Sequence, residues 1–251
     1  HQLMSDTTDI PVSASGAPRD NILERSMEER RSARKERWRL LRRRPGFVIG
    51  VVIVTFWVIC AAFGKRFVPY DPFNDLDFSN MQKGPSGDHW FGTDELGRDI
   101  FARVIFGART SLLTAAGAVT IAGLIGVPIG LVAGFFGGWR DTLLMRFVDV
   151  LLSLPGILFA MALIAVLGRS QMAALVAVGI TGIPSFARIT RAQVLSLRKR
   201  DFVTAVEALG GSSSYNMFRT VLPNAWSPIL VQVVILSSVA ILIEASLAFL
   251  G

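Results

Sequence analysis

Few side chains in this sequence have the types and spacing that catalysis or metal binding requires. The two histidines, His1 and His89, and the single cysteine, Cys60, cannot assemble a zinc site by themselves. Serines are plentiful, but the sequence indicates no partnered base that would complete a nucleophilic triad. The phosphate-cradling pattern G-x-x-x-x-G-K-[ST] does not occur, because the Gly-Gly-Trp-Arg run at 137–140 lacks both the spacing and the lysine. We therefore predict no enzyme active site in this chain.

The side chains that do suggest function are charges inside apolar runs. A charge in hydrocarbon costs at least about 2.5–3.5 kcal/mol, so each one is a functional hypothesis by default. Arg146 and Asp149 lie three residues apart, share a helix face and could neutralise each other. We interpret them as a structural pair near the membrane interface, with an ion site as the alternative. Glu244 has no partner that the sequence identifies, and it either faces a translocation path or caps a neighbouring helix.

These charges lie in segments long enough to cross a membrane. Hydrophobic residues make up 51% of the chain, mean hydropathy is +0.49, and charged residues make up only 18%. A span needs about 20 apolar residues, and such runs satisfy their backbone groups as helices. Five spans are expected, at residues 46–63, 110–136, 143–167, 172–189 and 225–250. The predicted fold class is therefore an all-α polytopic helix bundle in a membrane.

The distribution of charge predicts how the chain is oriented. Residues 1–44 hold eleven Arg/Lys and seven Asp/Glu, with the basic ones crowded before the first span, which favours a cytoplasmic amino terminus. Alternating spans then place the acidic stretch 69–109 outside and the basic stretch 188–224 inside. The basic tail is either a solvated segment or a helix on anionic headgroups, and no recognition module follows it to indicate nucleic acid. We expect a cytoplasmic segment 1–44 and a membrane domain 45–251, with an outer loop 69–109 and a cytoplasmic loop 190–224.

Glycines and prolines mark where the predicted helices pack and bend. Glycines recur every four residues in the second span, which lets helix backbones approach closely in lipid. We favour tight packing over a pore-lining role for this stripe. A proline in each of three spans breaks the hydrogen-bond ladder and predicts a kink. The glycines are Gly126, Gly130, Gly134 and Gly138, and the prolines are Pro128, Pro155 and Pro184.

The cytoplasmic stretch 202–223 has the pattern of two short amphipathic helices joined at a glycine turn. Asp201 is the expected N-cap of the first helix, Gly210 can adopt the left-handed conformation that ends it, and Pro223 is expected to stop the second. One of the serines 212–214 is expected to cap that second helix. Apolar residues share one face in each: Phe202, Ala205, Val206 and Leu209 in the first, and Tyr215, Phe218, Val221 and Leu222 in the second.

Apolar faces on a cytoplasmic loop predict a docking site, with folding back onto the chain's own bundle as the alternative. The order Ala205-x4-Gly210, then Leu222-Pro223, resembles the EAA loop of ATP-binding-cassette importer permeases. In that family the loop forms the helices that fit a groove in a cytoplasmic ATPase. The family's leading Glu falls on Thr204, its second Ala on Val206 and its Ile on Thr220, and Glu207 is not the motif glutamate. The resemblance assigns ATPase coupling to Phe202, Thr204, Ala205, Val206, Glu207, Leu209, Gly210, Phe218, Leu222 and Pro223.

A second resemblance covers roughly residues 42–251. The run HWFGTDELGRDIFARVIFGARTSLL, at 89–113, is similar to the outer-loop signature of the dipeptide, oligopeptide and nickel permease group. The arginine-flanked first span, DPFNDLDF, GGWRDTLLMRFVDVLLSLPGILFA and the final EASLAFLG resemble that group's C-type subunit. Such subunits resemble six-helix proteins, so a sixth span is expected beyond residue 251.

The resemblance implies half of the channel of an ATP-driven peptide importer in a bacterial inner or plasma membrane. It implies a sister permease, two cytoplasmic ATPase subunits or domains, an extracellular substrate-binding protein and membrane lipid as partners. ATP and Mg²⁺ are expected in the partner subunits and no cofactor on this chain. The alternatives are an ATP-independent secondary transporter or channel, which would place paired acidic residues or broken helices near the midplane, and a membrane-anchored scaffold.

Overall fold

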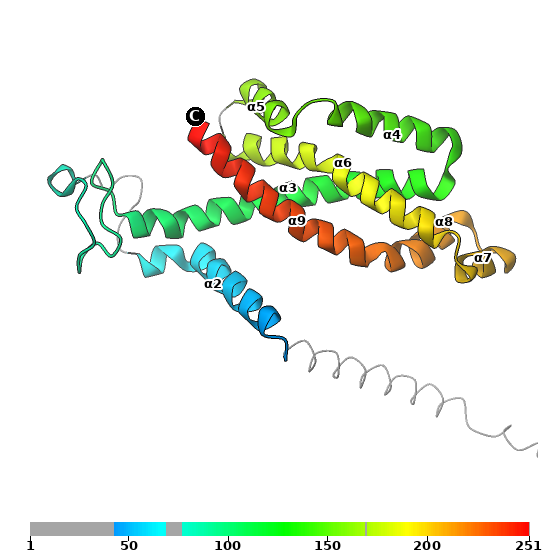
Figure 1. Ribbon diagram of the computed structural model, residues 1–251, viewed down its shortest axis with the longest axis horizontal. Coiled ribbons are helices and arrows are strands. Elements are labelled where there is room, and N and C mark those ends of the chain that lie inside the picture. The colour runs from blue at the N-terminus through cyan, green and yellow to red at the C-terminus, as the bar shows by residue number, and fades with distance from the viewer. Residues whose placement is uncertain (1–42, 69–76, 169, 251) are drawn as a thin grey trace, which may run out of the picture. The chain divides into compact units, whose positions relative to one another are not determined.

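The computed structural model describes residues 43–68, 77–168 and 170–250, and within these ranges the regular structure is helical (Figure 1). The chain divides into two units, 1–56 and 57–251. Of the first unit the structure describes the beginning of α2 (Pro45–Phe67), whose apolar side chains are mostly exposed. The lipid-surface helix predicted in the basic tail lies outside the described residues.

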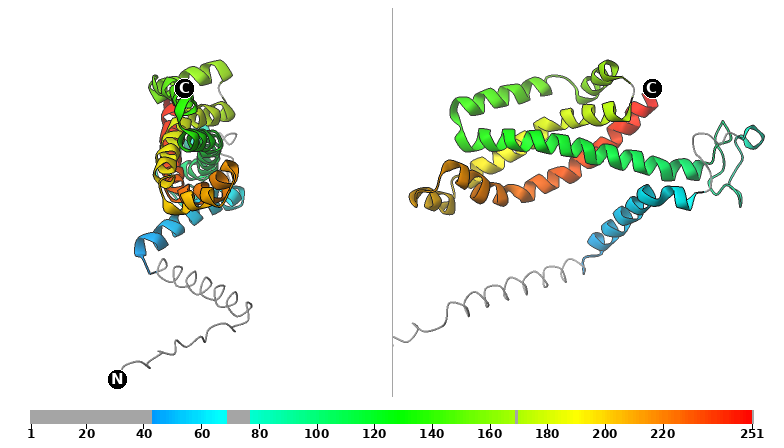
Figure 2. Two further views of the ribbon diagram at one scale, coloured as in Figure 1. Left: turned by 90° about the vertical axis from the view of Figure 1, so that its right-hand side faces the viewer. Right: turned by 180° about the vertical axis from the view of Figure 1, so that it is seen from behind.

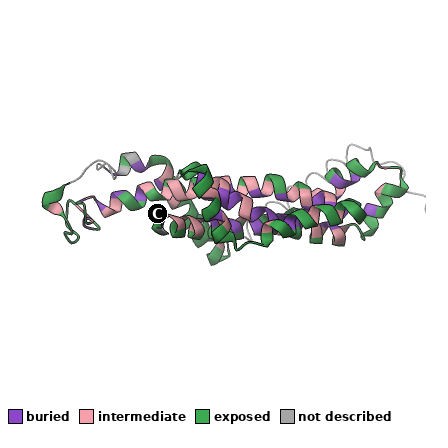
Figure 3. Cartoon of the chain, turned by 90° about the horizontal axis from the view of Figure 1, so that it is seen from above, coloured by how far each residue is buried: buried purple, intermediate pink, exposed green. Residues whose placement is uncertain are grey.

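Three long helices form the core of the second unit. They are α3 (Ile100–Phe136), α6 (Gln171–Leu197) and α9 (Leu222–Leu250), and each packs against the other two (Figures 1 and 2). Figure 3 shows the buried positions concentrated along the lines where helices meet. Because lipid offers no hydrophobic drive between helices, close backbone approach and van der Waals packing must hold them together.

The glycine stripe supplies that close approach between α3 and α6. A methyl group added to Gly126 would lie 2.7 Å from the carbonyl oxygen of Ile183, and one added to Gly134 would lie 2.9 Å from that of Arg191. A methyl group on Gly130 would overlap the carbonyl oxygen of Ala187. The predicted packing role of these three glycines is confirmed. Gly138 is not part of the stripe, because α3 ends before it and a side chain there would meet open space.

The expected third span is divided between two helices. α4 (Gly138–Leu152) and α5 (Gly156–Leu167) meet at an angle of 83°, with Pro155 at the start of α5. α3 and α6 instead continue as single helices through Pro128 and Pro184. Four helices of the described residues are long and apolar enough to cross a membrane, or five if the bent pair counts as one span.

Two expected loops are shorter than the hydropathy pattern indicated. α3 begins at Ile100 because Asp99 caps it, its carboxylate accepting the Ala102 N–H at 2.6 Å. With 37 residues α3 is about 55 Å long, so it extends beyond a hydrocarbon core of about 30 Å. At the other boundary α6 runs to Leu197 and α9 begins at Leu222. Apolarity marks where a helix lies in lipid, whereas capping marks where it begins.

Candidate functional site

The predicted helix–turn–helix lies at the end of the bundle where α3 and α6 finish and α9 begins. Its first helix is α7 (Asp201–Ala208), and its second begins with α8 (Ser213–Tyr215) (Figure 1). Residues 77–99, called here the outer segment because the sequence predicts them to lie outside, include the single turn η1 (Phe78–Asn80) and lie at the opposite end of α3 (Figure 2). The two loops that the sequence placed on opposite sides of the membrane are therefore at opposite ends of the longest helix.

The corner between the two helices is closed by backbone hydrogen bonds. Gly210 has φ of +80°, and its N–H donates to the Glu207 carbonyl while the Gly211 N–H donates to the Val206 carbonyl at 2.9 Å. This is the paired-bond pattern of a Schellman C-cap, so the left-handed conformation predicted for Gly210 is confirmed. The hydroxyl of Ser212 accepts the Tyr215 N–H at 3.3 Å and caps the second helix, also as predicted.

The second helix departs from its predicted course. After α8 the chain makes a π-helical turn, η2 (Asn216–Val221), and passes directly into α9. Pro223 is the second residue of α9 and does not stop the helix, so that prediction is wrong. The π-turn bonds span one residue more than α-helical bonds, as when the Leu222 N–H donates to the Met217 carbonyl, and this local rearrangement accommodates the proline's missing donor. The N-cap of α7 is Arg200, and Asp201 lies in the first turn, where its charge still favours the helix dipole.

One face of the helix–turn–helix is buried against the bundle. Val203, Met217 and Val221 form a single apolar cluster with Leu131 and Phe135 of α3 and Val194 of α6. For this face, the alternative prediction that the segment folds back onto the chain's own bundle is therefore confirmed. The cluster joins α7 to the ends of α3 and α6 and to the start of α9.

A second face is apolar and exposed. Phe202, Ala205 and Leu209 lie outward, with Leu209 89% exposed, and Val206 is half-buried beneath the corner. On the second helix Tyr215 and Phe218 are exposed, whereas Val221 is buried and Leu222 half-buried. The predicted second face is thus divided, because the π-turn shifts the helical register. Thr204, Glu207, Gly210 and Pro223 are exposed as well.

Sequence reasoning missed Asn216, which is fully buried between the two helices. Its amide nitrogen donates to the Val203 carbonyl at 3.2 Å and to Glu207 Oε1 at 3.4 Å. Its amide oxygen is buried without a hydrogen-bond partner within the described part of the chain. The sequence feature that could have indicated this buried position is a single amide side chain beside the apolar residues 217, 218 and 221.

The predicted Arg146–Asp149 pair does not form. Asp149 instead accepts from Arg188 of α6 at 2.7 Å, and Asp141 forms a two-bond ion pair with Arg191 at 2.5 and 2.6 Å. α4 packs alongside α6, and this packing brings Arg188 and Arg191 to the acidic side chains of α4. An ion pair between two helices therefore replaces the pair predicted within one helix. Arg146 is exposed and makes no ion pair with any residue that the structure describes.

Glu244 acquires a partner that the sequence did not identify. The hydroxyl of Thr114, a fully buried residue of α3, is 3.5 Å from Glu244 Oε1. The second carboxylate oxygen, Oε2, is buried with no hydrogen bond from the described residues. Glu244 therefore lies at the contact of α3 and α9, beside the interior of α3 and not at a helix end, so its bond to Thr114 is not the predicted helix cap.

The outer segment is held by side-chain-to-backbone hydrogen bonds around one carboxylate. Asp94 accepts the N–H groups of Leu96 at 2.8 Å and of Arg98 at 2.9 Å, and its other oxygen accepts from the guanidinium groups of Arg98 and Arg103. Desolvation alone would raise the pKa of Asp94, but these bonds outweigh it and lower the pKa to about 2. The carboxylate is consequently charged throughout the physiological range.

Two further features fix this segment onto α3. Asp99, which caps α3, also lies 2.9 Å from Nδ1 of His89. Gly97 has φ of +74° and sits so close to the Asp77 carbonyl oxygen that any side chain would overlap it. Residues 89–99 of the signature therefore form a folded segment bonded to the first turn of α3, and residues 100–113 are part of α3 itself.

These features can be compared with known proteins. Residues 126–251 match the family described as "binding-protein-dependent transport system inner membrane component", and residues 32–85 match "N-terminal TM domain of oligopeptide transport permease C". The chain belongs to this transport family. It is a polytopic permease subunit of an ABC importer, and such a system also includes an ATPase and a binding protein.

Several curated relatives are similar to this permease over most of its length. The dipeptide transport system permease protein DppC of Alkalihalophilus pseudofirmus is 40% identical over 217 residues, which cover 86% of this chain and 71% of the relative. The glutathione transport system permease protein GsiD of Escherichia coli is 40% identical over 216 residues, with the same coverage. GsiD of Pectobacterium atrosepticum is 37% identical over 217 residues, covering 86% of this chain and 72% of the relative.

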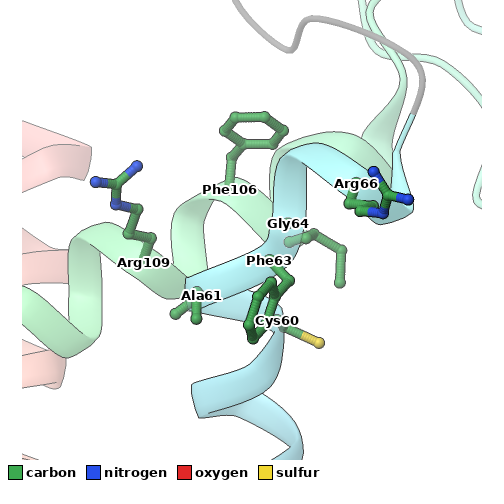
Figure 4. Close-up of a pocket in the computed structure, with 9 residues that line it drawn as sticks. Cys60, Ala61, Phe63, Gly64, Arg66, Phe106 and Arg109 are labelled. Carbon is green, nitrogen blue, oxygen red and sulfur yellow. The ribbon is translucent and has the colours of Figure 1, made fainter.

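The permease also has a cavity of about 250 Å³ between α2 and the first turns of α3 (Figure 4). Its walls are mostly apolar, with Phe63, Ile105 and Phe106 among them. The side chains of Arg66 and Arg109 lie on opposite sides of it, so they do not converge on one ligand. Within the described ranges no three His, Cys, Asp or Glu side chains group closely enough to hold a metal ion.

Proposed function

We propose that this permease forms half of the translocation path of a peptide importer and receives force from an ATPase at the 202–223 helix–turn–helix. The observation that carries the proposal is the two-sided construction of α7. Its outward face presents Phe202 and Leu209, and its inward side chain, Val203, is buried in the apolar cluster of the bundle. An apolar surface of this kind on an aqueous loop requires a protein partner.

The buried cluster explains how a push at this surface would reach the membrane. Because Val203 belongs to one buried cluster with residues of α3, α6 and η2, the turn that leads into α9, a displacement of α7 would act on the ends of these helices. Packed side chains are bistable rather than continuously deformable, so such a displacement selects between two arrangements of the bundle. ATP and Mg²⁺ would bind in the ATPase subunits, and this chain would supply the mechanical contact.

The proposal also includes the orientation of the chain and its other partners. A cytoplasmic amino terminus in a bacterial inner membrane puts α7 on the ATP side and the outer segment 77–99 on the side of the substrate-binding protein. A sister permease would supply the other half of the path. The relatives are named for dipeptide and glutathione transport, which supports short peptides as the cargo class.

The direct test is purification of the chain from its own cells in mild detergent. We expect a P-loop ATPase and a second permease to co-purify in fixed ratio, and Leu209→Asp to release the ATPase while the second permease is retained. The control is Ser213→Asp, which adds the same charge at another exposed position of the hairpin. Uptake into vesicles that continued without ATP but stopped when the ion gradient was removed would contradict the proposal and favour a secondary transporter.

A further inference from the structure

The contact between the coupling helix α7 and η2, the turn that leads into α9, is made by two kinds of interaction. One is the apolar packing of Val203 against Met217 and Val221, which allows surfaces to slide past each other. The other is the amide group of Asn216, which bonds to the Val203 carbonyl at one point of α7 and to Glu207 one turn later. Hydrogen bonds are directional, so this second contact resists sliding and rotation.

The location of Asn216 gives this bond mechanical importance. It is the first residue of the π-helical turn that leads into α9 without a break. π-turns interrupt the regular bond ladder of a helix and are frequent at functional sites, because the helix direction can change there at low cost. A bond from α7 to the first residue of this turn therefore acts on the point where α9 bends most readily.

The burial of Asn216 strengthens the effect of its bonds. The residue is fully buried, so water does not compete for the bonds to Val203 and Glu207. A hydrogen bond shielded from water is electrostatically stronger than one in water, so the bonds from Asn216 fix the orientation of α7 on the π-turn.

We infer that Asn216 is a positioning residue that makes α7 and the π-turn move as one piece, so that a push on α7 changes the direction of α9. This inference rests on the proposed ATPase contact and adds to it the element through which the force passes. It assigns α9, which carries Glu244 at its contact with α3, as the helix that responds first. The bonds from Asn216 transmit the displacement of α7 to the π-turn, and the apolar cluster holds α7 against the bundle.

The experiment uses the complete transporter in vesicles with its binding protein and a short peptide. Asn216→Leu is expected to keep ATP hydrolysis while the peptide transported per ATP falls about threefold to tenfold, the factor that loss of one to two net hydrogen bonds would give. The control is Thr190→Val, which replaces the other fully buried polar side chain of this end of the bundle, on α6, without touching α7 or the π-turn. It is expected to leave the ratio of peptide to ATP unchanged.

A distance measurement separates transmission from simple destabilisation. Spin labels would be attached to Ala208→Cys on α7 and Arg219→Cys in the π-turn, both exposed positions, in a Cys60→Ala background. With Asn216 present, the label-to-label distance is expected to be the same with and without a non-hydrolysable ATP analogue. In the Asn216→Leu variant the distribution is expected to broaden or shift when the analogue binds.

An unchanged peptide-to-ATP ratio together with an unchanged distance in Asn216→Leu would overturn the inference. If that variant does not assemble, Asn216→Ala and Asn216→Gln provide the comparison at the same buried site. The alanine must then lose coupling while the glutamine, which keeps an amide donor, retains it, and equal behaviour of the two would overturn the inference. Failure of the proposed function would instead appear as ATP-independent uptake in the unmodified transporter.

Discussion

The two ends of α3 hold their adjoining loops by different physical means. At the outer end, segment 77–99 is fixed by polar bonds that converge on Asp94 and Asp99, and by glycines such as Gly97 whose backbone excludes a side chain. At the inner end, α7 is held by an apolar cluster and one buried amide, and its outer face is left apolar and exposed. Both loops expose apolar side chains, Trp90 and Phe91 at one end and Leu209 at the other, so the difference between them lies in how each is held to the bundle.

This difference indicates which end is built to move. Local hydrogen bonds between a side chain and nearby backbone fix one geometry and depend little on the rest of the protein. Packing between helices that are distant in sequence instead links the position of α7 to the whole bundle. We therefore expect substitutions at the inner end to change coupling and substitutions at the outer end to change local order.

The largest effect is expected from Leu209→Asp. The side chain is 89% exposed, so the substitution should leave the permease folded, but a charge at an apolar protein contact costs several kcal/mol. Peptide uptake into vesicles should fall at least about tenfold, and the melting temperature of the purified permease should stay the same. Unchanged uptake would show that this face makes no contact needed for transport.

Asp94→Ala is expected to have the next largest effect, confined to the outer end. The change removes the acceptor for the N–H groups of Leu96 and Arg98. Amide hydrogen exchange at these two residues should become about tenfold faster or more, while exchange in α7 stays the same. Glu95→Ala, which removes an exposed neighbouring carboxylate, is the control and should alter neither region. Faster exchange in α7 would mean that the two ends are not independent.

The two glycines of the inner corner should differ in a measurable way. A methyl group on Gly211 would lie 2.8 Å from the Val206 carbonyl oxygen, whereas one on Gly210 would meet open space and only strain its φ of +80°. Gly211→Ala should cost about 1–3 kcal/mol of stability and Gly210→Ala about 1 kcal/mol. Thermal unfolding of the detergent-solubilised permease should rank Gly211→Ala below Gly210→Ala, and the reverse order would contradict the close approach of Gly211 to the Val206 carbonyl.

The smallest effect is expected from mild acid. The pKa of Asp94 is lowered in the folded protein to about 2, below its ordinary value of 3.8. A carboxylate with a depressed pKa contributes stability that is full above its unfolded pKa and is lost as the pH falls through the folded one. Exchange protection of residues 94–98, corrected for intrinsic exchange rates, should therefore be the same at pH 7 and pH 5 and should decline between about pH 4 and pH 2. A loss already complete at pH 5 would exclude the Asp94-centred bonds.

What the sequence predicted correctly at the inner end was local chemistry. The left-handed Gly210 and the cap at Ser212 depend on neighbours within a few residues, and both are confirmed. The π-turn was not predictable from periodicity, because one additional residue per turn shifts every later side chain. Its consequences, buried Val221 and a helix that continues through Pro223, were missed for that reason.

Tertiary contacts account for most of the remaining errors. Spacing along α4 indicated a pair between Arg146 and Asp149, but packing of α4 beside α6 gave Asp149 a different partner, Arg188. The close approach of α3 and α6 was predictable, because Gly126, Gly130 and Gly134 recur at a fixed interval. The outer segment could be assigned as a loop and by resemblance, but neither pattern reveals that Asp94 accepts four hydrogen bonds.

Site-specific cross-linking tests the central claim most directly. A photo-reactive cross-linker would be attached to Leu209→Cys at the inner end, and in a separate protein to Phe91→Cys at the outer end, both in a Cys60→Ala background in the assembled transporter. The account predicts that the inner cross-linker captures the ATPase subunit and that the outer one does not. Capture of the ATPase from position 91, or of no ATPase from position 209 in a transporter that hydrolyses ATP, would contradict it.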